Sequence, residues 1–369
     1  MTVTLLTGYP AFTARRMATK VLEAEPQTQL VVLVREKFRE DATRFFAQLP
    51  SDRAQRVELL AGDITHMDLG LSGTEWKDLA ARTSRILHLA SIYFVGVERA
   101  VVHAVNLRGT TEVLELAEAC HGLDRLVHFS TTQVSGDRTG LVLEEELEAG
   151  QGFRNHYEET KFRAERLVRQ AAARIPVTIL RPGILVGDSR SGEIDRLDGP
   201  YHLIRMIVAS PLDMTPPLPA RGDAPLHLVP IDYVIDAAHA ILRRPDSVGR
   251  TYHIVDPNPM PARRAFERVA QVAGRRLPRG FIPAALSRML FRTPGLERFV
   301  RSPLAFVETL ATDVDYSDRN TREALRGTGI VCPAFEAYVE QLVVYVQDRV
   351  RREREAKQTS APEPPDPLI

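Results

Sequence analysis

The stretch VTLLTGYPAFTARRMATKVLEA, residues 3–24, has the pattern of a strand, a short turn and a helix. The run VTLL is apolar, whereas residues 12–24 place apolar side chains three and four apart, as on one face of a helix. Parallel strands are connected through such units, and their turns face the crevice where ligands bind. The stretch therefore predicts the first unit of an α/β fold, with TGYPAF as a nucleotide-binding turn.

Apolar, β-branched runs continue to alternate with amphipathic segments through the first half of the chain. The expected strands are 3–7, 29–34, 57–63, 85–90, 125–130 and 177–182, and the expected helices are 12–24, 39–48, 98–120 and 153–175. Runs that are apolar on both faces are typical of strands covered by helices on both sides. We therefore predict a Rossmann-like, doubly wound parallel sheet.

The alternation stops after Asp188, at a loop-rich region that includes the proline-rich stretch 210–225, and resumes with LHLVPIDYVIDAAHAIL and TYHIVD. We predict a smaller, mainly helical C-terminal substrate-binding subdomain beside the Rossmann domain. The expected parts are a Rossmann domain of 1–188 with 228–258 returning to it, a cap of 189–227 and 259–350, and a disordered tail of 351–369. The tail is predicted from its charged and then proline-rich composition.

The composition excludes several classes of function. Positive and negative residues balance at 48 each, so no net field attracts nucleic acid or an anionic membrane. Cys120 and Cys332 belong to no metal-ligand pattern, so we expect no metal site and a reducing compartment. The sequence shows no signal peptide and no apolar run of about 20 residues, which predicts a cytoplasmic protein. The stretch 281–310, which mixes arginines with large apolar residues, fits the roof of a cleft better than a membrane contact.

The turn TGYPAF keeps one of the three glycines that are usual in pyrophosphate-binding turns. Gly8 permits the tight turn, while Ala11 and Ala14 occupy the later glycine positions. Pro10 suits the start of the helix because it has no amide hydrogen to lose. Since a helix N-terminus offers unpaired amides to an anion, we assign the turn to a cofactor. The assigned residues are Gly8, Tyr9, Pro10, Ala11 and Phe12, and an ordinary strand-to-helix turn is the alternative.

Two strand ends favour a phosphorylated nicotinamide dinucleotide. Arg35 follows the second strand, where an NAD-specific fold usually carries an acidic residue, and with Lys37 it suits the extra phosphate of NADP(H). Asp63 and Ile64, in AGDI, close the third strand where an adenine ring would lie. The alternatives are a solvated arginine and an aspartate that only caps a turn.

The segment NHYEETKFRAERLV, 155–168, places Tyr157 and Lys161 four residues apart, and so on one face of a helix. An ammonium beside a phenol lowers the pKa of the phenol from about 10, which would suit proton transfer. The preceding strand end, HFSTTQVSG, supplies a hydroxyl that can hold a substrate carbonyl oxygen. We favour Thr131 for this role over its neighbours Ser130 and Thr132, and a chance surface pair of tyrosine and lysine is the competing interpretation.

Taken in order, the motifs AGDI, HLAS, VNLRGTT, HFSTT, NHYEETK and RPGILVGD resemble those of the extended short-chain dehydrogenases/reductases over residues 1 to about 258. The resemblance implies catalytic roles for Thr131, Tyr157 and Lys161, with Lys161 also holding the nicotinamide ribose. It places the segment around Ala90 and Ser91 at the central part of the cofactor.

Further along, the resemblance places Pro182 and Gly183 on the nicotinamide side. Asn106, in VNLRGTT, matches a polar helix position of the family, but a structural asparagine is the alternative and it stays outside the catalytic set.

Within this family, RPGILVGDSRSGE (181–193) and LDGPYHLI (197–204) are similar to the branch that contains thioester reductases and fatty acyl-CoA reductases. That branch reduces thioesters with NADPH. The resemblance thus implies an NADP(H)-dependent oxidoreductase acting on a fatty acyl or polyketide-like thioester, carried by CoA or by a separate carrier protein. Three alternatives stay open: a ketone or secondary-alcohol reductase for a bulky substrate, a sugar-nucleotide epimerase or dehydratase, and a non-catalytic NADP-binding regulator.

Overall fold

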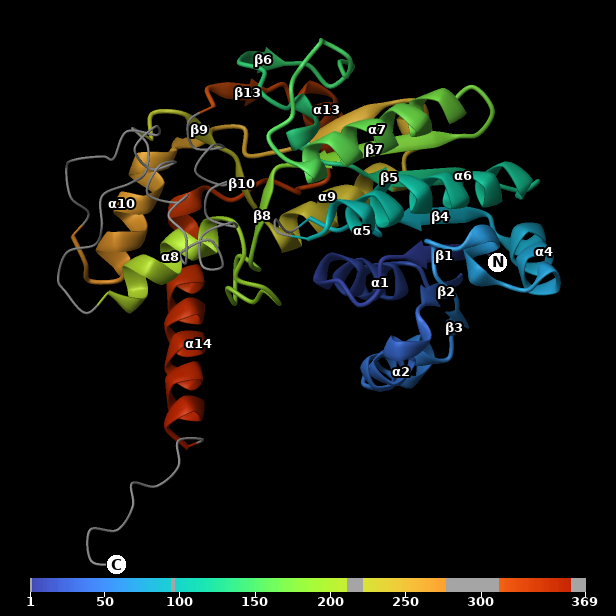
Figure 1. The fold of residues 1–369 in the computed structure, drawn as a ribbon, viewed down its shortest axis with the longest axis horizontal. Coiled ribbons are helices and arrows are strands. Elements are labelled where there is room, and N and C mark those ends of the chain that lie inside the picture. The colour runs from blue at the N-terminus through green and yellow to red at the C-terminus, as the bar shows by residue number, and fades with distance from the viewer. Residues whose placement is uncertain (1, 94–96, 211–221, 277–311, 360–369) are drawn as a thin grey trace, which may run out of the picture.

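The computed structural model describes residues 2–93, 97–210, 222–276 and 312–359. At its centre is a seven-stranded parallel sheet with the order β11-β7-β5-β4-β1-β2-β3 (Figure 1). The strands are β1 (Thr2–Thr7), β2 (Thr28–Val34), β3 (Val57–Ala61), β4 (Arg85–His88), β5 (Arg125–Phe129), β7 (Val177–Pro182) and β11 (Thr251–Ile254). The predicted α/β class and Rossmann-like sheet are confirmed.

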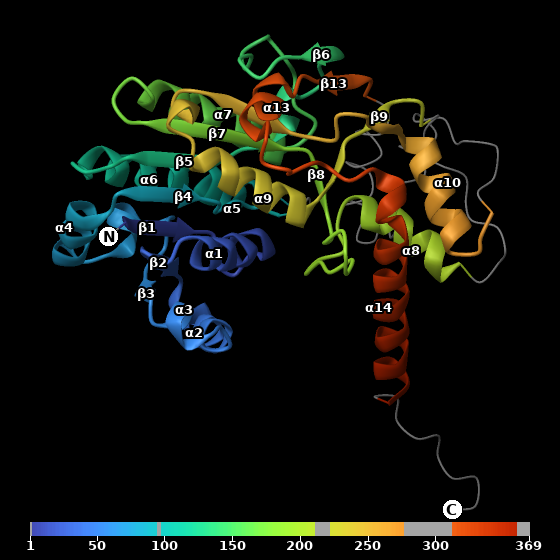
Figure 2. The same ribbon diagram turned by 180° about the vertical axis from the view of Figure 1, so that it is seen from behind.

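Helices cover both faces of this sheet (Figures 1 and 2). One face packs against α1 (Phe12–Ala24) and α9 (Ile231–Leu242), and the other against α4 (Gly73–Arg82), α6 (Gly109–Ala119) and α7 (His156–Ala171). Successive strand residues enter opposite cores, so that Leu6 packs with α1 and α9 while Leu5 packs with α4, α6 and α7. This alternation explains why apolar residues occur on both faces of the strands.

The remaining helices near the sheet connect or flank these elements. They are α2 (Arg39–Ala47), α3 (Ser51–Ala54), α5 (Arg99–His103), which continues through a π-helical turn (Ala104–Arg108) into α6, and α13 (Arg319–Leu325). Short 3-10 helices are η1 (Glu36–Phe38), η2 (Met67–Gly70), η4 (Thr132–Ser135), η5 (Pro245–Ser247) and η6 (Phe335–Ala337).

The boundary of the first helix differs from the expectation in one detail. Pro10 does not begin α1, because Ala11 occupies the N-cap position and the helix starts at Phe12. The amide of Ala11 donates to the carbonyl of Gly8 at 2.9 Å, so residues 8–11 form a closed turn before the helix. Pro10 therefore belongs to the turn that leads from β1 into the helix.

A second apolar core lies beside the sheet and involves three helices, α8 (Pro200–Ala209), α10 (Ala262–Val272) and α14 (Val339–Thr359). Tyr201, Phe266 and Leu342 are buried together there. Both segments predicted to form the cap contribute to this core, and α14 projects away from the sheet (Figure 2). Short paired strands connect the parts: β8 (Ile184–Val186) with β10 (Leu228–Pro230), β9 (Pro225–Leu226) with β12 (Met260–Pro261), and β6 (Gly140–Val142) with β13 (Val314–Tyr316).

The end of α14 lies beyond the predicted start of the tail. Residues 351–359 are helical, whereas the sequence led us to expect disorder from residue 351 onward. Ion pairs support this part of the helix, since Arg351 contacts Asp348 at 2.8 Å and Glu353 contacts Arg205 at 2.7 Å. The stretch 281–310 and most of the proline-rich stretch lie outside the described residues. Over the ranges that the structure describes, no helix has the length and apolar character needed to span a membrane.

Candidate active site

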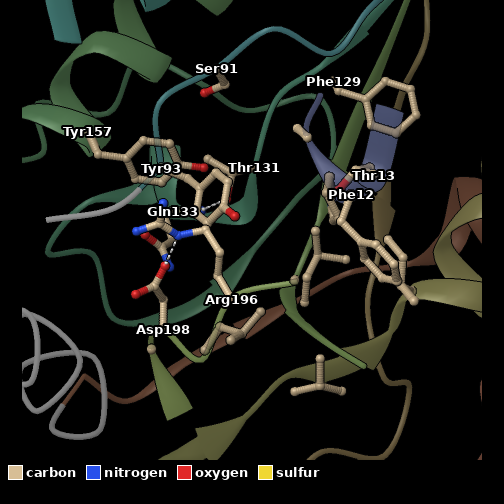
Figure 3. A pocket seen from close by; sticks show the side chains of 18 of the residues that line it. Phe12, Thr13, Ser91, Tyr93, Phe129, Thr131, Gln133, Tyr157, Arg196 and Asp198 are labelled. Atoms are coloured by element: carbon tan, nitrogen blue, oxygen red, sulfur yellow. Dashed lines mark hydrogen bonds and ion pairs between the residues drawn. The ribbon is translucent and has the colours of Figure 1, made fainter. Parts of the chain in front are cut away.

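A cavity opens at the carboxyl ends of the central strands, between the start of α1 and the first turns of α7 (Figure 3). In doubly wound sheets this is the position at which ligands bind. Of the residues predicted from the sequence, those that line it are Ala11, Phe12, Ser91, Thr131, Tyr157, Lys161, Pro182 and Gly183. The predicted residues that are not among its lining residues are Gly8, Tyr9, Pro10, Arg35, Asp63, Ile64 and Ala90.

The turn between β1 and α1 depends on Gly8. Its φ of +106° is in the region that favours glycine, and an added Cβ would lie 2.8 Å from the backbone of Leu89 and Ala90. The amides of the first turn of α1 have no partner within the helix, as in every α-helix. Among the described residues no side chain caps them either. Because Ala11 and Phe12 line the cavity, this helix end faces it, as an anion-binding turn requires.

Tyr9 points away from the cavity lining and toward α2. Its hydroxyl donates to the Asp41 carboxylate at 2.6 Å, and burial together with this bond raises the pKa of Tyr9 well above its usual range. The ring packs against Phe45 and Phe46. Tyr9 thus joins the turn to α2, and its contacts are those of a structural residue.

Arg35 and Lys37 lie together at the end of β2, on the exposed surface. Both place their cations over the ring of Phe38, with distances to the ring centre of 5.1 Å and 5.0 Å. The two predicted positive charges therefore lie together beyond the second strand, but neither residue lines the cavity.

Asp63 and Ile64 are occupied by local contacts. The Asp63 carboxylate accepts hydrogen bonds from the amide and the hydroxyl of Thr65 at 2.9 and 2.8 Å. The Ile64 side chain is buried so close to α6 that a Cβ on Gly109 would lie 2.6 Å from it. The side-chain contacts of Asp63 are thus those of the turn-capping alternative, and a role toward the cofactor stays a prediction.

A buried histidine connects the first turn with the strand end HLAS. His88 Nδ1 lies 2.8 Å from the Thr7 hydroxyl, and Nε2 lies 3.0 Å from the Thr110 hydroxyl. Since the Thr110 hydroxyl donates to the carbonyl of Asn106, it accepts from Nε2–H, and Nδ1 accepts from Thr7. Burial, assisted by the charge of Lys161, lowers the pKa of His88 to about 3, so the ring is neutral. His88 begins the motif HLAS, but the sequence analysis had assigned no role to it.

Asn106 holds the chain that follows β4. Its side-chain amide donates to the Ile92 carbonyl at 3.0 Å and its oxygen accepts from the Ile92 amide at 2.7 Å. It also donates to the Thr160 hydroxyl on α7 at 3.1 Å, and the Ser91 hydroxyl donates to it at 3.3 Å. Asn106 is buried and absent from the cavity lining, in agreement with the structural alternative.

The three hydroxyls at the end of β5 have different partners. Ser130 donates to Glu165 at 2.6 Å, and Thr132 bonds to the hydroxyl of Tyr316. Thr131 instead bonds to the hydroxyl of Tyr157 in the cavity. Its oxygen also accepts from the amide of Gln133 at 3.2 Å, so its own proton is directed at the Tyr157 oxygen in the cavity. This is the arrangement expected if Thr131 is the residue that holds the substrate carbonyl.

Tyr157 and Lys161 project from the first two turns of α7. The helix begins where it does because the side chain of Asn155 accepts the amide hydrogen of Glu158 at 3.0 Å. This cap replaces the earlier start expected at residue 153. Both Tyr157 and Lys161 line the cavity, as their spacing predicted.

The electrostatics of Tyr157 differ from the expectation. Burial raises its pKa to about 12, although the hydrogen bond from Thr131 acts in the opposite direction. The ammonium of Lys161 does not lower it, because Lys161 Nζ donates to the carbonyl of Phe129 at 2.6 Å and is not directed at the phenol. The predicted lowering of the phenol pKa by Lys161 is therefore wrong for the protein alone, and Tyr157 is protonated at neutral pH.

The burial of Lys161 is unfavourable for its charged form. It lowers the pKa of Lys161 to about 8, against the opposing effect of Glu165. Lys161 is thus a buried cation that loses its proton at mildly alkaline pH.

A buried ion pair joins the end of β7 to α7, the helix that carries Tyr157 and Lys161. Arg181, at the end of β7, donates from Nε and Nη2 to the two oxygens of Glu165 at 2.9 and 2.6 Å. Burial alone would raise the pKa of Glu165, but Arg181 and further partners lower it to about 2. Gly183 follows, and a Cβ there would lie 2.7 Å from the His227 carbonyl. This close approach of β8 to β10 shapes the wall at Pro182 and Gly183.

The sequence analysis assigned no role to several cavity residues. They are Tyr93, Gln133, Arg196 and Asp198, which lie near Tyr157 (Figure 3), and Asn155. Gln133, Asn155 and Asp198 fall within the quoted stretches HFSTTQVSG, NHYEETK and LDGPYHLI, whereas Tyr93 and Arg196 lie outside them. Only the position of Gln133, two residues after Thr131, could have suggested it. Over the described residues no group of three possible metal ligands occurs.

Comparison with known proteins identifies relatives of this arrangement. Residues 6–238 match the NAD-binding family model described as Male sterility protein. The chain is 29% identical over 273 residues to fatty acyl-CoA reductase wat from Drosophila melanogaster, which covers 63% of this chain and 52% of that protein. The chain thus spans about half the length of this relative, and smaller shares of the next two, 21% and 4%.

Solved structures agree with the sequence matches. The terminal R domain from the myxalamid PKS-NRPS biosynthetic pathway superimposes with a TM-score of 0.80 at 26% identity, covering 96% of this chain and 91% of that one. UDP-glucuronic acid 4-epimerase from Bacillus cereus, in complex with NAD, has a TM-score of 0.68 at 18% identity, covering 95% of this chain and 98% of the epimerase. The second likeness concerns the fold alone.

Proposed function

Because the chain belongs to the extended short-chain dehydrogenases/reductases, in the branch of the thioester and fatty acyl-CoA reductases, we propose that it is an NADP(H)-dependent oxidoreductase that reduces an acyl thioester. The juxtaposition of Thr131, Tyr157 and Lys161 in one cavity at the carboxyl ends of the strands is the observation that carries this proposal.

The residues around the cavity fit a nicotinamide dinucleotide. Gly8 allows the turn to pass close against the backbone of Leu89 and Ala90, and the uncapped start of α1 that follows suits a pyrophosphate. Pro182 and Gly183 form a wall against which a flat ring can lie. The dinucleotide, when bound in its reduced form, supplies the hydride.

Positive charge near the first turn supports the phosphorylated form of the cofactor. Arg35 and Lys37 lie at the end of β2, and the charges of Arg15 and Arg44 both act on Tyr9, whose backbone belongs to the turn. A phosphate on the adenosine ribose would meet positive charge here, which favours the phosphorylated form of the cofactor.

In the proposed reaction Thr131 and Tyr157 act on the carbonyl oxygen of the substrate. Thr131 would turn its hydroxyl proton from the Tyr157 oxygen to the carbonyl oxygen. Tyr157, protonated at neutral pH, delivers a proton to this oxygen as negative charge develops there. Addition of a hydride and this proton to the carbonyl would give a hemithioacetal. Its C–S bond then breaks as its hydroxyl proton passes through Tyr157 to the departing thiolate, so that an aldehyde and a thiol are released. The acyl group would arrive on CoA or on a carrier protein.

Lys161 would orient the cofactor ribose and supply positive charge beside the reacting groups. Its bond to the Phe129 carbonyl holds the ammonium at the end of β5, two residues before Thr131. This position supports a role toward the cofactor and toward the charge that would develop at Tyr157.

Substitution of the phenol tests the proposal. We expect the purified protein to oxidise NADPH when an acyl thioester such as hexanoyl-CoA is added, followed by absorbance at 340 nm. Tyr157→Phe should lower kcat at least about 100-fold while NADPH affinity stays within about twofold, because only the donated proton is lost. Tyr252→Phe is a matched control, since that buried hydroxyl on β11 has no partner in the described part of the chain. Full activity of Tyr157→Phe would contradict the assigned role.

A further inference from the structure

The cavity has two chemically different ends (Figure 3). Phe12 and Phe129 lie at one end, beside the start of α1. Tyr93, Gln133, Arg196 and Asp198 gather at the other, next to Tyr157 and Thr131. If the cofactor occupies the end near α1, the acyl group has to approach the two catalytic hydroxyls from the polar end.

Gln133 presents an amide to this polar end. Its backbone is fixed, because its amide hydrogen bonds to Thr131 and its carbonyl accepts from the amide of Gly136 at 3.1 Å. Its side-chain amide, in contrast, makes no hydrogen bond with any residue that the structure describes, although it is partly buried and lines the cavity. A side-chain amide has two donors and an acceptor. Gln133 carries it two positions after Thr131, the residue proposed to bind the reacting carbonyl.

Arg196 and Asp198 extend the polar end. Arg196 Nε donates to Asp198 at 2.8 Å, which holds the guanidinium beside the cavity. Tyr93 lies beside them, next to Tyr157 (Figure 3). A half-exposed cation, a carboxylate and a phenol are thus gathered near the proposed proton donor.

We propose that Gln133, with Arg196 at its side, is a specificity-determining residue that hydrogen-bonds a polar group on the acyl chain, an amide or a hydroxyl within a few bonds of the reacting carbonyl. The inference rests on the proposed function for the direction from which the acyl group enters. A plain hydrocarbon chain at this end would cover the Gln133 amide without pairing it, and burying an unpaired polar group is unfavourable. Sites built to hydrogen-bond a substrate group discriminate against analogues that lack it.

Measurements of equilibrium binding test this inference independently of catalysis. Pantetheine amides, in which nitrogen replaces the thioester sulfur, can be bound to the protein saturated with NADP⁺ and followed by calorimetry. The matched pair is N-acetyl-β-alanyl and hexanoyl, whose chains have the same length, with 3-hydroxyhexanoyl as a second polar probe. We expect at least one polar probe to bind about tenfold or more tightly than hexanoyl.

Variants identify the residue responsible. Gln133→Met, which keeps the length of the side chain, should bring the affinities of polar and hexanoyl probes to within about threefold of each other. Arg196→Met should reduce the preference partially, and Gln55→Met, at an exposed position after α3, should leave it unchanged. Unaltered NADP⁺ affinity in each variant shows that the fold is intact.

Each outcome has a defined meaning. Equal affinities in the wild type, tighter binding of hexanoyl, or an unchanged preference in Gln133→Met would overturn the inference. Failure of the wild type to reduce the CoA thioester of either the hexanoyl or the N-acetyl-β-alanyl group, while the binding preference and its loss are observed, would leave the assignment of Gln133 intact and refute the proposed function instead.

Discussion

Replacement of Lys161 by methionine should stabilise the folded protein while removing its activity. The side chain is buried, and burial lowers its pKa from 10.5 to about 8. Below pH 8 the lysine is charged in both the folded and the unfolded chain, so the whole penalty of burying the charge is present. Between pH 8 and 10.5 the folded chain has released this proton and the unfolded chain still holds it, so the penalty shrinks as pH rises.

The size of the pKa shift of Lys161 determines how much the substitution changes the free energy of unfolding. The penalty is about 3 kcal/mol at pH 7 and falls to about 1.4 kcal/mol at pH 9.5. The variant also loses the bond from Lys161 to the Phe129 carbonyl, a cost of about 1–2 kcal/mol that does not change with pH over this range. The difference between the two pH values is therefore the cleaner quantity, and the advantage of Lys161→Met should decrease by about 2 kcal/mol from pH 7 to pH 9.5.

Urea unfolding of the cofactor-free protein measures this difference. The fluorescence of Trp76, the one tryptophan of the chain, reports unfolding from α4. Lys77→Met, on the exposed face of the same helix, is the control and should show no pH-dependent difference from the wild type. If the free energies of wild type and Lys161→Met change in parallel with pH, the lysine is not held as a desolvated cation and the reasoning about its environment fails.

Three further changes test separate parts of the site. Arg35→Asp should weaken NADPH binding about 10- to 100-fold while NADH binding changes little, and an unaltered preference in a fluorescence titration would remove Arg35 from the cofactor site. Gly8→Ala should lower the free energy of unfolding by about 1–3 kcal/mol, because its φ of +106° and contacts at 2.8 Å leave no room for a Cβ; a stability equal to that of the wild type would refute this strain. His88→Leu, compared with exposed His121→Leu, should cost about 1–3 kcal/mol in urea unfolding because Thr7 loses its acceptor, and equal curves for both variants would argue against the bridge.

The fold could be predicted because the local pattern and the tertiary contacts agree. The strands of the sheet are apolar on both faces and each face does meet a helical layer, so their runs and boundaries are visible in the sequence. The prediction was less accurate where an end depends on a specific hydrogen bond, as at Asn155, or on charged side chains that support a helix, as at Arg351. Neither the hydrogen bond at Asn155 nor the ion pair at Arg351 is visible in the spacing of apolar residues from which the helices were predicted.

Part of the site could be predicted for a similar reason. Tyr157 and Lys161 are one helical turn apart, so their neighbourhood follows from sequence spacing alone. Gln133 and Arg196 are 63 positions apart in the chain, and only the course of the loops brings them to one end of the cavity. The pKa of Tyr157 could not be foreseen either, because the direction of the Lys161 ammonium is set by the carbonyl of Phe129.

The pairing of β8 with β10 has a consequence for how such chains can diversify. Val186 and Leu228 are members of the same short parallel ladder, so the segment 187–227 leaves and rejoins the protein at neighbouring points. Lengthening a loop whose ends are already held together costs little, about 0.6 kcal/mol for each doubling. Evolution or a designer can therefore exchange or extend this segment, and with it the floor of the cavity at Arg196 and Asp198, while the strands that carry Thr131 and the helix that carries Tyr157 keep their places.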